Sequence, residues 1–197
     1  MAKSLMHHIA KTLIGGLTFI GLSMPVASAP KVRSASEFYH VGGETADEIR
    51  QDMNSKSTIQ ENGAQYDAST KWNVKWNLRW AEANGQCEIT QVKTTVDVRY
   101  VFPKLKSPGS IPKRLRQQWE RYLAALLLHE HEHKNIGVRA AKEIESEIKN
   151  LAARRSCSQL EKEANRLGNA VLAKSRVIEK HFDRSTKHGM NDGAIFP

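Results

Sequence analysis

The stretch TKWNVKWNLRW, residues 70–80, alternates polar and apolar side chains from its second residue onward. Strict alternation puts the apolar side chains on one face of a β-strand, so one face is buried and the other meets water. The apolar positions are Trp72, Val74, Trp76, Leu78 and Trp80. A second alternating stretch, residues 87–102, follows a turn at 83–86. We expect the two stretches to pair as an antiparallel hairpin that ends before Pro103.

Downstream of these strands, the spacing of apolar residues changes from two to three or four. That spacing continues from about residue 110 to residue 151 and predicts one long helix of about 35–40 residues, with Gly137 as its weakest position. The stretch NLAARRSCS, residues 150–158, breaks the pattern. A second helix is expected at 158–181, and the rest of the chain is expected to be irregular.

The residues before the hairpin add a short strand and a short helix. EFYHVGG, residues 37–43, is typical of a strand that ends at a Gly-Gly turn, and Thr45 with Glu48 forms a capping box at the start of a helix. The predicted fold is α+β, with a small antiparallel sheet packed on a long helix and a C-terminal antiparallel helix hairpin.

The N-terminus is typical of a secretory signal peptide. A basic start is followed by an apolar stretch and a small-residue site, so we expect residues 1–28 to be removed after Ser28, with cleavage after Ala29 or an uncleaved anchor as alternatives. Removal takes away two lysines and no acid, which lowers the net charge from +9 to +7. Residues 29–197 then form a single periplasmic or secreted domain, for which neither nucleic acid nor stable membrane insertion is expected.

The chain has two cysteines, Cys87 and Cys157. Export places them in an oxidising compartment, where one disulfide is the simplest arrangement, and two buried thiols are the alternative. The bond would connect the start of the second strand to the turn between the two long helices.

The stretch LLLHEHEHKN, residues 126–135, contains an H-E-x-x-H motif within the long helix. His129 and His133 are four residues apart, so they share one helix face and can bind one zinc ion. Glu130 beside them can act as general base on zinc-activated water. His131 points away from this face, and a helix face with salt bridges is the structural alternative.

A catalytic zinc site needs a third protein ligand. The extended motif is absent, because Ile136 and Arg139 stand at its last two positions. If the helix hairpin turns near residue 154, the end of the second helix and the tail return to the level of the two histidines. Glu179, His181 and His188 are therefore the candidates, and geometry leaves the choice among them open.

Several stretches resemble a bacterial family of secreted zinc-dependent proteases, long catalogued as a domain of unknown function. They are YHVGGETADEI, ASTKWNVKWNLRW, the cysteine that opens a strand ending in VFP, WERYLAALLLHEHEH and the tail FDRSTKHG, so the resemblance covers about residues 39–196. The tail pattern of the family is Tyr-Asp-x-x-Thr-x-His-Gly, in which Phe182 replaces the tyrosine here. The resemblance implies a zincin-like fold and zinc peptidase activity. It also favours His188 as the third ligand, with Asp183 orienting a ligand histidine.

We therefore expect an exported zinc metallohydrolase, a peptidase that acts on peptide or protein substrates, with cell-wall peptide as one alternative. Zinc would be held by His129, His133 and His188, Glu130 would be the catalytic base, and an edge strand would align the extended substrate. One alternative is a non-catalytic periplasmic zinc-binding or structural protein, which a closed site of four ligands would favour. Another is a cell-wall-binding module, which exposed tryptophans would favour.

Overall fold

Two long strands and two long helices form most of the structure, a computed structural model that describes residues 29–61 and 63–197. The predicted signal peptide, residues 1–28, lies outside the described residues. The elements in chain order are β1 (Lys31–Val41), α1 (Ala46–Lys56), β2 (Gln60–Glu61), β3 (Ala64–Gln65), β4 (Ser69–Ala83), β5 (Gln86–Leu105), α2 (Lys113–Lys149), α3 (Cys157–Thr186) and the 3-10 helix η1 (Met190–Asp192). The α+β class predicted from the sequence is confirmed.

The main sheet has three strands in the order β1-β5-β4. β4 and β5 form the predicted antiparallel hairpin, but β1 pairs with β5 in parallel, so the expectation of a purely antiparallel sheet is wrong for β1. β5 also continues through Pro103 to Leu105. Pairing with β4 stops at Val101, so Pro103 lies where β5 has only β1 as a neighbour, a position that tolerates a missing N–H donor.

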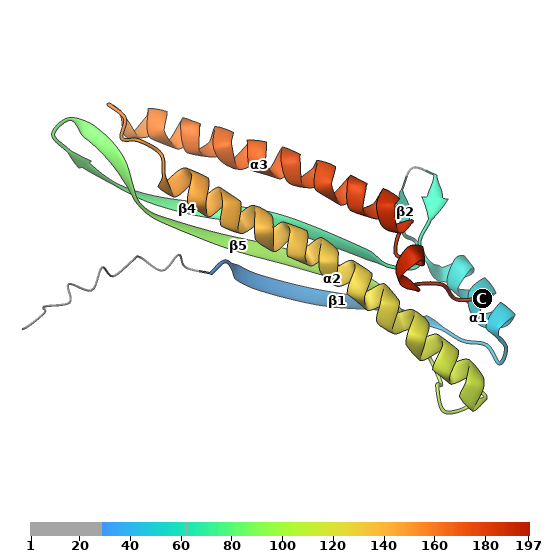
Figure 1. Cartoon of the computed structure of the whole chain (residues 1–197). Helices are drawn as coiled ribbons and strands as arrows, with labels where there is room; N and C mark the ends of the chain where they lie inside the picture. Colours follow the sequence, from blue (N-terminus) through green and yellow to red (C-terminus); the bar gives the residue numbers. More distant parts are fainter. Residues whose placement is uncertain (1–28, 62) are drawn as a thin grey trace, which may run out of the picture.

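Helices α2 and α3 lie side by side on one face of the sheet (Figure 1). The alternating residues of β5 point toward them and are buried, namely Val92, Thr94, Val96, Val98, Tyr100 and Phe102. The other face of the sheet carries polar side chains such as Lys93 and Arg99 and is exposed. The alternation in the sequence therefore predicted correctly which face of the sheet forms the core.

Two tryptophans of β4 connect the sheet to the helices. A Cβ atom at Gly137 of α2 would lie 2.7 Å from the Trp72 ring, and a Cβ atom at Gly168 of α3 would lie 2.7 Å from the Trp76 ring. Gly137 is thus required by a close approach rather than being a weak point of α2. Trp72 and Trp76 belong to the packed interior, whereas Trp80, at the far end of β4, is 41 % exposed.

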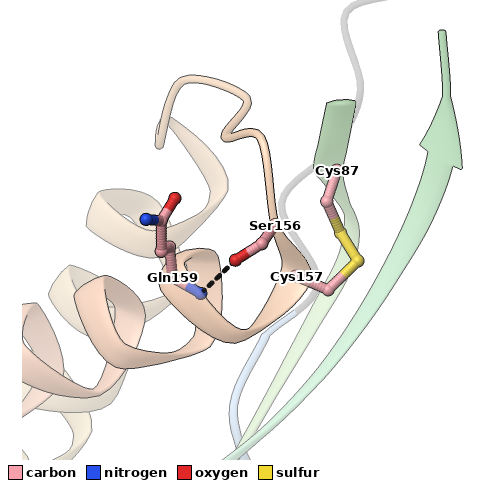
Figure 2. The surroundings of a disulfide bond; sticks show 4 residues. All are labelled: Cys87, Ser156, Cys157 and Gln159. Carbon is pink, nitrogen blue, oxygen red and sulfur yellow. Dashed lines mark hydrogen bonds between the residues drawn. A yellow bond between two sulfur atoms is a disulfide. The ribbon is translucent and has the colours of Figure 1, made fainter. Parts of the chain in front are cut away.

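The disulfide between Cys87 and Cys157 is present, as predicted (Figure 2). It joins the start of β5 to the first residue of α3, and its Cα atoms are 5.2 Å apart. Main-chain hydrogen bonds between Cys87 and Arg154 run alongside the bond in both directions. Ser156 caps α3 by accepting a hydrogen bond from the Gln159 N–H at 3.1 Å. This end of the helix pair is therefore held covalently, by main-chain pairing and by a cap.

Asp67, just before β4, links the opposite end of the fold. Its carboxylate accepts hydrogen bonds from Arg50 of α1 at 2.9 Å and from the Tyr122 hydroxyl of α2 at 2.7 Å, while its carbonyl accepts one from Tyr39. Arg50 also donates to the carbonyl of Phe196, whose ring packs on Tyr122. These contacts fix the segment that leads into β4. The predicted cap of α1 is present too, since Thr45 accepts from the Glu48 N–H.

Candidate metal centre

Three side chains that can bind a metal meet between α2 and α3. His129, His133 and Asp183 each direct one ligand atom to a common point. The two Nε2 atoms are 3.3 Å apart, and Asp183 Oδ1 lies 3.2 Å from His129 Nε2 and 3.0 Å from His133 Nε2. A tetrahedral zinc ion with bonds of about 2.0–2.1 Å holds its ligand atoms about 3.3 Å apart. The triangle of donor atoms therefore has the size that such an ion requires.

The helices position these ligands by their periodicity. His129 and His133 are one turn apart on α2, and Glu179 and Asp183 are one turn apart on α3. His133 faces both acids, which puts the midpoint of the hairpin at residue 156, halfway between 133 and 179. The turn expected near residue 154 is present, at residues 150–156, but the register of α3 against α2 differs from the expected one by four residues, or one helical turn.

The second helix is also longer than expected. α3 continues to Thr186 instead of ending near residue 181, so Asp183 is a helical residue that points back at α2. The sequence assigned Asp183 a supporting role and placed it in an irregular tail. Its position four residues after Glu179 was the available signal, because that spacing repeats the spacing of the two histidines.

Aromatic and glycine residues enclose the ligand imidazoles. The Phe182 ring stacks on His129 with centroids 4.7 Å apart and meets His133 edge-on at 5.2 Å. Gly189 packs against the other side of His129, since a Cβ atom there would be 3.0 Å from the imidazole. Both histidines are therefore held in one orientation from several sides.

A chain of polar contacts supports His133 from behind. Its Nδ1 atom makes no hydrogen bond of good geometry, but Glu179 Oε1 lies 3.4 Å away and accepts a 2.6 Å hydrogen bond from the Trp72 indole. Ligand histidines commonly have a carboxylate at the nitrogen that does not bind the metal. Glu179, one of the candidate ligands from the sequence, therefore lies at the supporting position.

The charges at this centre are strongly coupled. Burial opposes a charged His133, but the adjacent carboxylates of Asp183 and Glu179 outweigh it and raise the pKa of His133 to about 10. Burial likewise opposes a charged Asp183, but hydrogen bonds from the two histidines hold its pKa well below the usual range. The site thus stabilises a positive charge among its donor atoms, in the form of a proton when no metal is bound.

Glu130 lies next to the two histidines and is only 5 % exposed. The Thr70 hydroxyl of β4 lies 2.6 Å from its carboxylate oxygen Oε2 and 3.0 Å from its main-chain oxygen. Burial raises the pKa of Glu130, and the hydrogen bond from Thr70 opposes part of that rise. Nothing in the spacing of Thr70 linked it to Glu130 in advance, because the contact depends on how α2 crosses the sheet.

The remaining predicted residues fall outside the group of three ligands. His188 is close to it, with Nδ1 3.6 Å from Asp183 Oδ1 and Nε2 3.1 Å from the Tyr66 hydroxyl. His181 is exposed and is not part of the group. His131 is exposed on the other side of α2, where its ring meets Tyr100, and Glu132 pairs with Arg139. These last two placements agree with the sequence-based expectation.

The centre opens into a cleft of about 1030 Å³. The start of β4, the end of α3, the tail and the β2–β3 hairpin contribute to its walls, together with His129, Glu130, His133 and Asp183. A molecule in this cleft can therefore reach the metal ligands and Glu130 at once. Within residues 29–61 and 63–197, no helix is long and apolar enough to cross a membrane.

Comparison with known proteins identifies the family. The profile of a family described as "Bacterial protein of unknown function (DUF922)" matches residues 36–189, most of the chain, so the protein belongs to that family. No curated protein matches the chain, and no solved structure matches it either. The family resemblance seen in the sequence is therefore confirmed at the level of the family, while the zinc-protease activity and the zincin-like fold stay predictions.

Proposed function

We propose that this member of the DUF922 family is an exported zinc-dependent hydrolase that cleaves peptide bonds. The observation that carries the proposal is the triangle of donor atoms from His129, His133 and Asp183, with the buried carboxylate of Glu130 beside it. Two imidazoles and one carboxylate are a ligand set typical of catalytic zinc, which leaves one coordination position free. The disulfide supports export, because such bonds persist in oxidising compartments.

Bound zinc would supply Lewis acidity, which polarises a carbonyl and acidifies water. Glu130 would take the proton from the attacking water and deliver it to the leaving amine nitrogen. Its burial favours this role, because a raised pKa brings the carboxylate closer to neutral pH. Thr70 would hold the carboxylate in one orientation by its 2.6 Å hydrogen bond, and Glu179 would hold the imidazole of His133.

One observation favours a second candidate, a zinc-binding protein without turnover. His188 Nδ1 lies 3.6 Å from Asp183 Oδ1, so a small movement of the tail would add a fourth ligand and close the site. The sequence resemblance favoured His188 as a ligand. The two candidates differ in whether the fourth position is open to substrate or filled by this imidazole.

The test combines metal analysis with one pair of matched variants. We expect the purified mature protein to contain one zinc ion per chain and to hydrolyse members of a peptide library. Glu130→Gln should retain zinc and lose turnover by about 10²–10⁴-fold. Glu132→Gln is the control, since this acid lies on the same helix but pairs with Arg139 outside the centre. Equal hydrolysis by both variants would exclude Glu130 as the base, and zinc binding without hydrolysis by wild type would favour the second candidate.

A further inference from the structure

Four cations line the cleft around the metal centre. Arg176, Lys180 and Lys187 come from α3 and the residue after it. Lys71 comes from the start of β4 and lies with Arg99 on the face of the sheet opposite the helices. Within the part of the chain that the structure describes, none of the four forms an ion pair. The remaining two cations of the cleft are neutralised, since Arg50 pairs with Asp67 at 2.9 Å and Arg99 lies 3.4 Å from Glu37. The cleft therefore presents uncompensated positive charge at its walls.

The acids of the cleft do not offset this charge. Glu130, Glu179 and Asp183 lie at the metal centre, where a bound divalent ion would offset two of their three negative charges. Asp67 and Glu37 are the partners of the two neutralised arginines. Among the described residues that line the cleft, this leaves Glu61 of the β2–β3 hairpin as the one acid without such a role. With a divalent ion bound, four free cations would thus face Glu61 and one remaining carboxylate charge of the metal centre.

The cations of α3 are arranged around a metal ligand. Arg176 and Lys180 precede Asp183 by seven and three residues, so the helical repeat places them on its face of α3, and Lys187 directly follows the end of the helix. Lys180 and Arg176 lie about 4.5 and 10.5 Å from Asp183 along the helix axis. We call Arg176, Lys180 and Lys187 the positive stripe. It extends to both sides of Asp183 along the helix axis.

Two other cations of α3 are in ion pairs. Arg166 and Lys174 lie outside the cleft, and each has an acidic partner, Glu163 at 2.7 Å for Arg166 and Glu143 at 2.8 Å for Lys174. The two ion pairs of this helix thus lie away from the cleft. Lys162 and Arg184 also lie outside it, without an ion pair among the described residues, and the cations that line the cleft are available to a ligand.

We propose that the substrate is an acidic peptide, whose carboxylates contact this stripe on both sides of the scissile bond. The inference rests on the peptidase activity proposed above and adds the class of substrate. An extended peptide also suits the geometry of β4, an edge strand of the main sheet whose first residues, Ser69 to Lys71, line the cleft next to Glu130. Main-chain pairing would position the peptide, and the cations would select its charge.

The proposal is tested by binding, so that it does not depend on turnover. The probes are a fluorescent peptide that alternates aspartate with alanine and its matched version with asparagine. Fluorescence anisotropy is measured on the zinc-loaded mature Glu130→Gln protein at low and high salt. We expect the aspartate peptide to bind at least about tenfold more tightly, with a preference that salt removes.

Charge variants locate the contact. The double variant Lys180→Ala with Lys187→Ala should lower the affinity for the aspartate peptide by about tenfold, because each exposed ion pair contributes about a factor of three. The affinity for the asparagine peptide should not change. Lys162→Ala is the matched control, because it is an exposed cation of α3 that does not line the cleft. Circular dichroism spectra and zinc content are compared first, to exclude misfolded variants. If either variant has lost its fold or zinc, charge-preserving Lys→Arg and charge-removing Lys→Gln substitutions are compared at the same positions.

The outcomes separate the two proposals. Equal binding of the two peptides, or an equal loss with Lys162→Ala, would overturn the acidic-peptide inference whether or not the protein is an enzyme. Tight binding of a DNA oligonucleotide or of heparin with none of the aspartate peptide would overturn it in favour of another polyanion. Selective binding of the aspartate peptide together with no hydrolysis by wild type would leave the inference standing as ligand recognition and would reject the peptidase.

Discussion

The two ends of the α2–α3 hairpin are closed in different ways. At one end, Cys87 and Cys157 form a disulfide, and the neighbouring main chain is paired between Cys87 and Arg154. At the other end, His129 and His133 bring their two Nε2 atoms to 3.3 Å, and Asp183 Oδ1 lies 3.2 and 3.0 Å from them. Protein groups satisfy one another at the first end. At the second, three donor atoms converge on a point that a cation could occupy.

The disulfide end therefore stabilises the fold without a ligand, whereas the stability gained at the metal-centre end depends on a bound ion. A bond that closes a loop across a sequence separation of 70 stabilises the native state without any ligand. A cluster of convergent donor atoms gains its stability from an ion, so its contribution depends on metal concentration. Four predictions follow from the contrast, from the largest effect to the smallest.

Replacing both cysteines, Cys87→Ser with Cys157→Ser, should lower the free energy of unfolding by roughly 4 kcal/mol, because the unfolded chain regains its loop entropy. Urea unfolding of the metal-free protein measures the change. The zinc affinity of the folded variant should stay within about twofold of wild type, since the two ends share no partner. A large parallel loss of zinc affinity would show that the ends are coupled and would break the comparison.

Replacing one side chain of the metal centre should change zinc affinity and leave the disulfide end of the α2–α3 hairpin unaffected. Asp183→Ala should weaken zinc binding by more than about 100-fold, because a loss of up to about 100-fold is typical of residues that only support a metal ligand. His188→Ala should weaken it by less than about tenfold. Competition with a chelator at fixed pH gives both affinities. The opposite order would establish His188 as the third ligand, as the resemblance predicted, and would assign Asp183 the supporting role.

Two glycines offer a matched test of how the sheet supports the site. Gly137→Ala and Gly168→Ala should each destabilise the protein by about 1–3 kcal/mol, because the new methyl group would lie 2.7 Å from the ring of Trp72 or Trp76. Gly137→Ala should also weaken zinc binding by about tenfold, since Trp72 holds Glu179 behind His133. Gly168→Ala should not, because Trp76 bonds to Asn165 instead. Equal zinc affinities for both variants would contradict the supporting chain.

The smallest expected effect is the pH dependence of zinc affinity, which arises from proton release by His133. Without metal, the pKa of His133 is about 10, so the imidazole is charged at neutral pH and must lose its proton when it binds zinc. Binding should therefore release about one proton per ion, and affinity should rise about tenfold per pH unit, or 1.4 kcal/mol, until the pH nears that pKa. The metal-free protein should conversely lose stability as pH rises through this range. Calorimetry in buffers of different ionisation enthalpy counts the protons, and a count near zero would contradict the prediction.

Much of the fold was predictable because its main elements have a clear period. The alternation in β4 and β5 identified the buried face, and the spacing of apolar residues identified α2 almost to its ends. β1 was harder, because nine of its eleven residues are exposed and it carries no alternation that would indicate its partner or direction. Its parallel pairing depends on the path of the chain around α1, which no local pattern records.

The candidate site was predictable where one helix contains it and uncertain where two helices meet. His129, Glu130 and His133 follow from spacing within α2 alone. Asp183 depends on the register of α3 against α2, and a shift of two residues in the midpoint of the helix pairing moves every opposing residue by one helical turn. Thr70 depends on where α2 crosses β4, a contact between residues sixty positions apart.

The disulfide has one more consequence, for proteolysis. The segment Lys106 to Ser110 between β5 and α2 is exposed, and it lies inside the loop that Cys87 and Cys157 close. A protease that cuts there produces two polypeptides, but the disulfide keeps them together as a two-chain molecule. All three metal-facing residues stay on the second polypeptide, while Thr70, which orients Glu130, belongs to the first. Nicked protein should therefore migrate as one band on a denaturing gel until a reductant is added, and only then separate into its two parts.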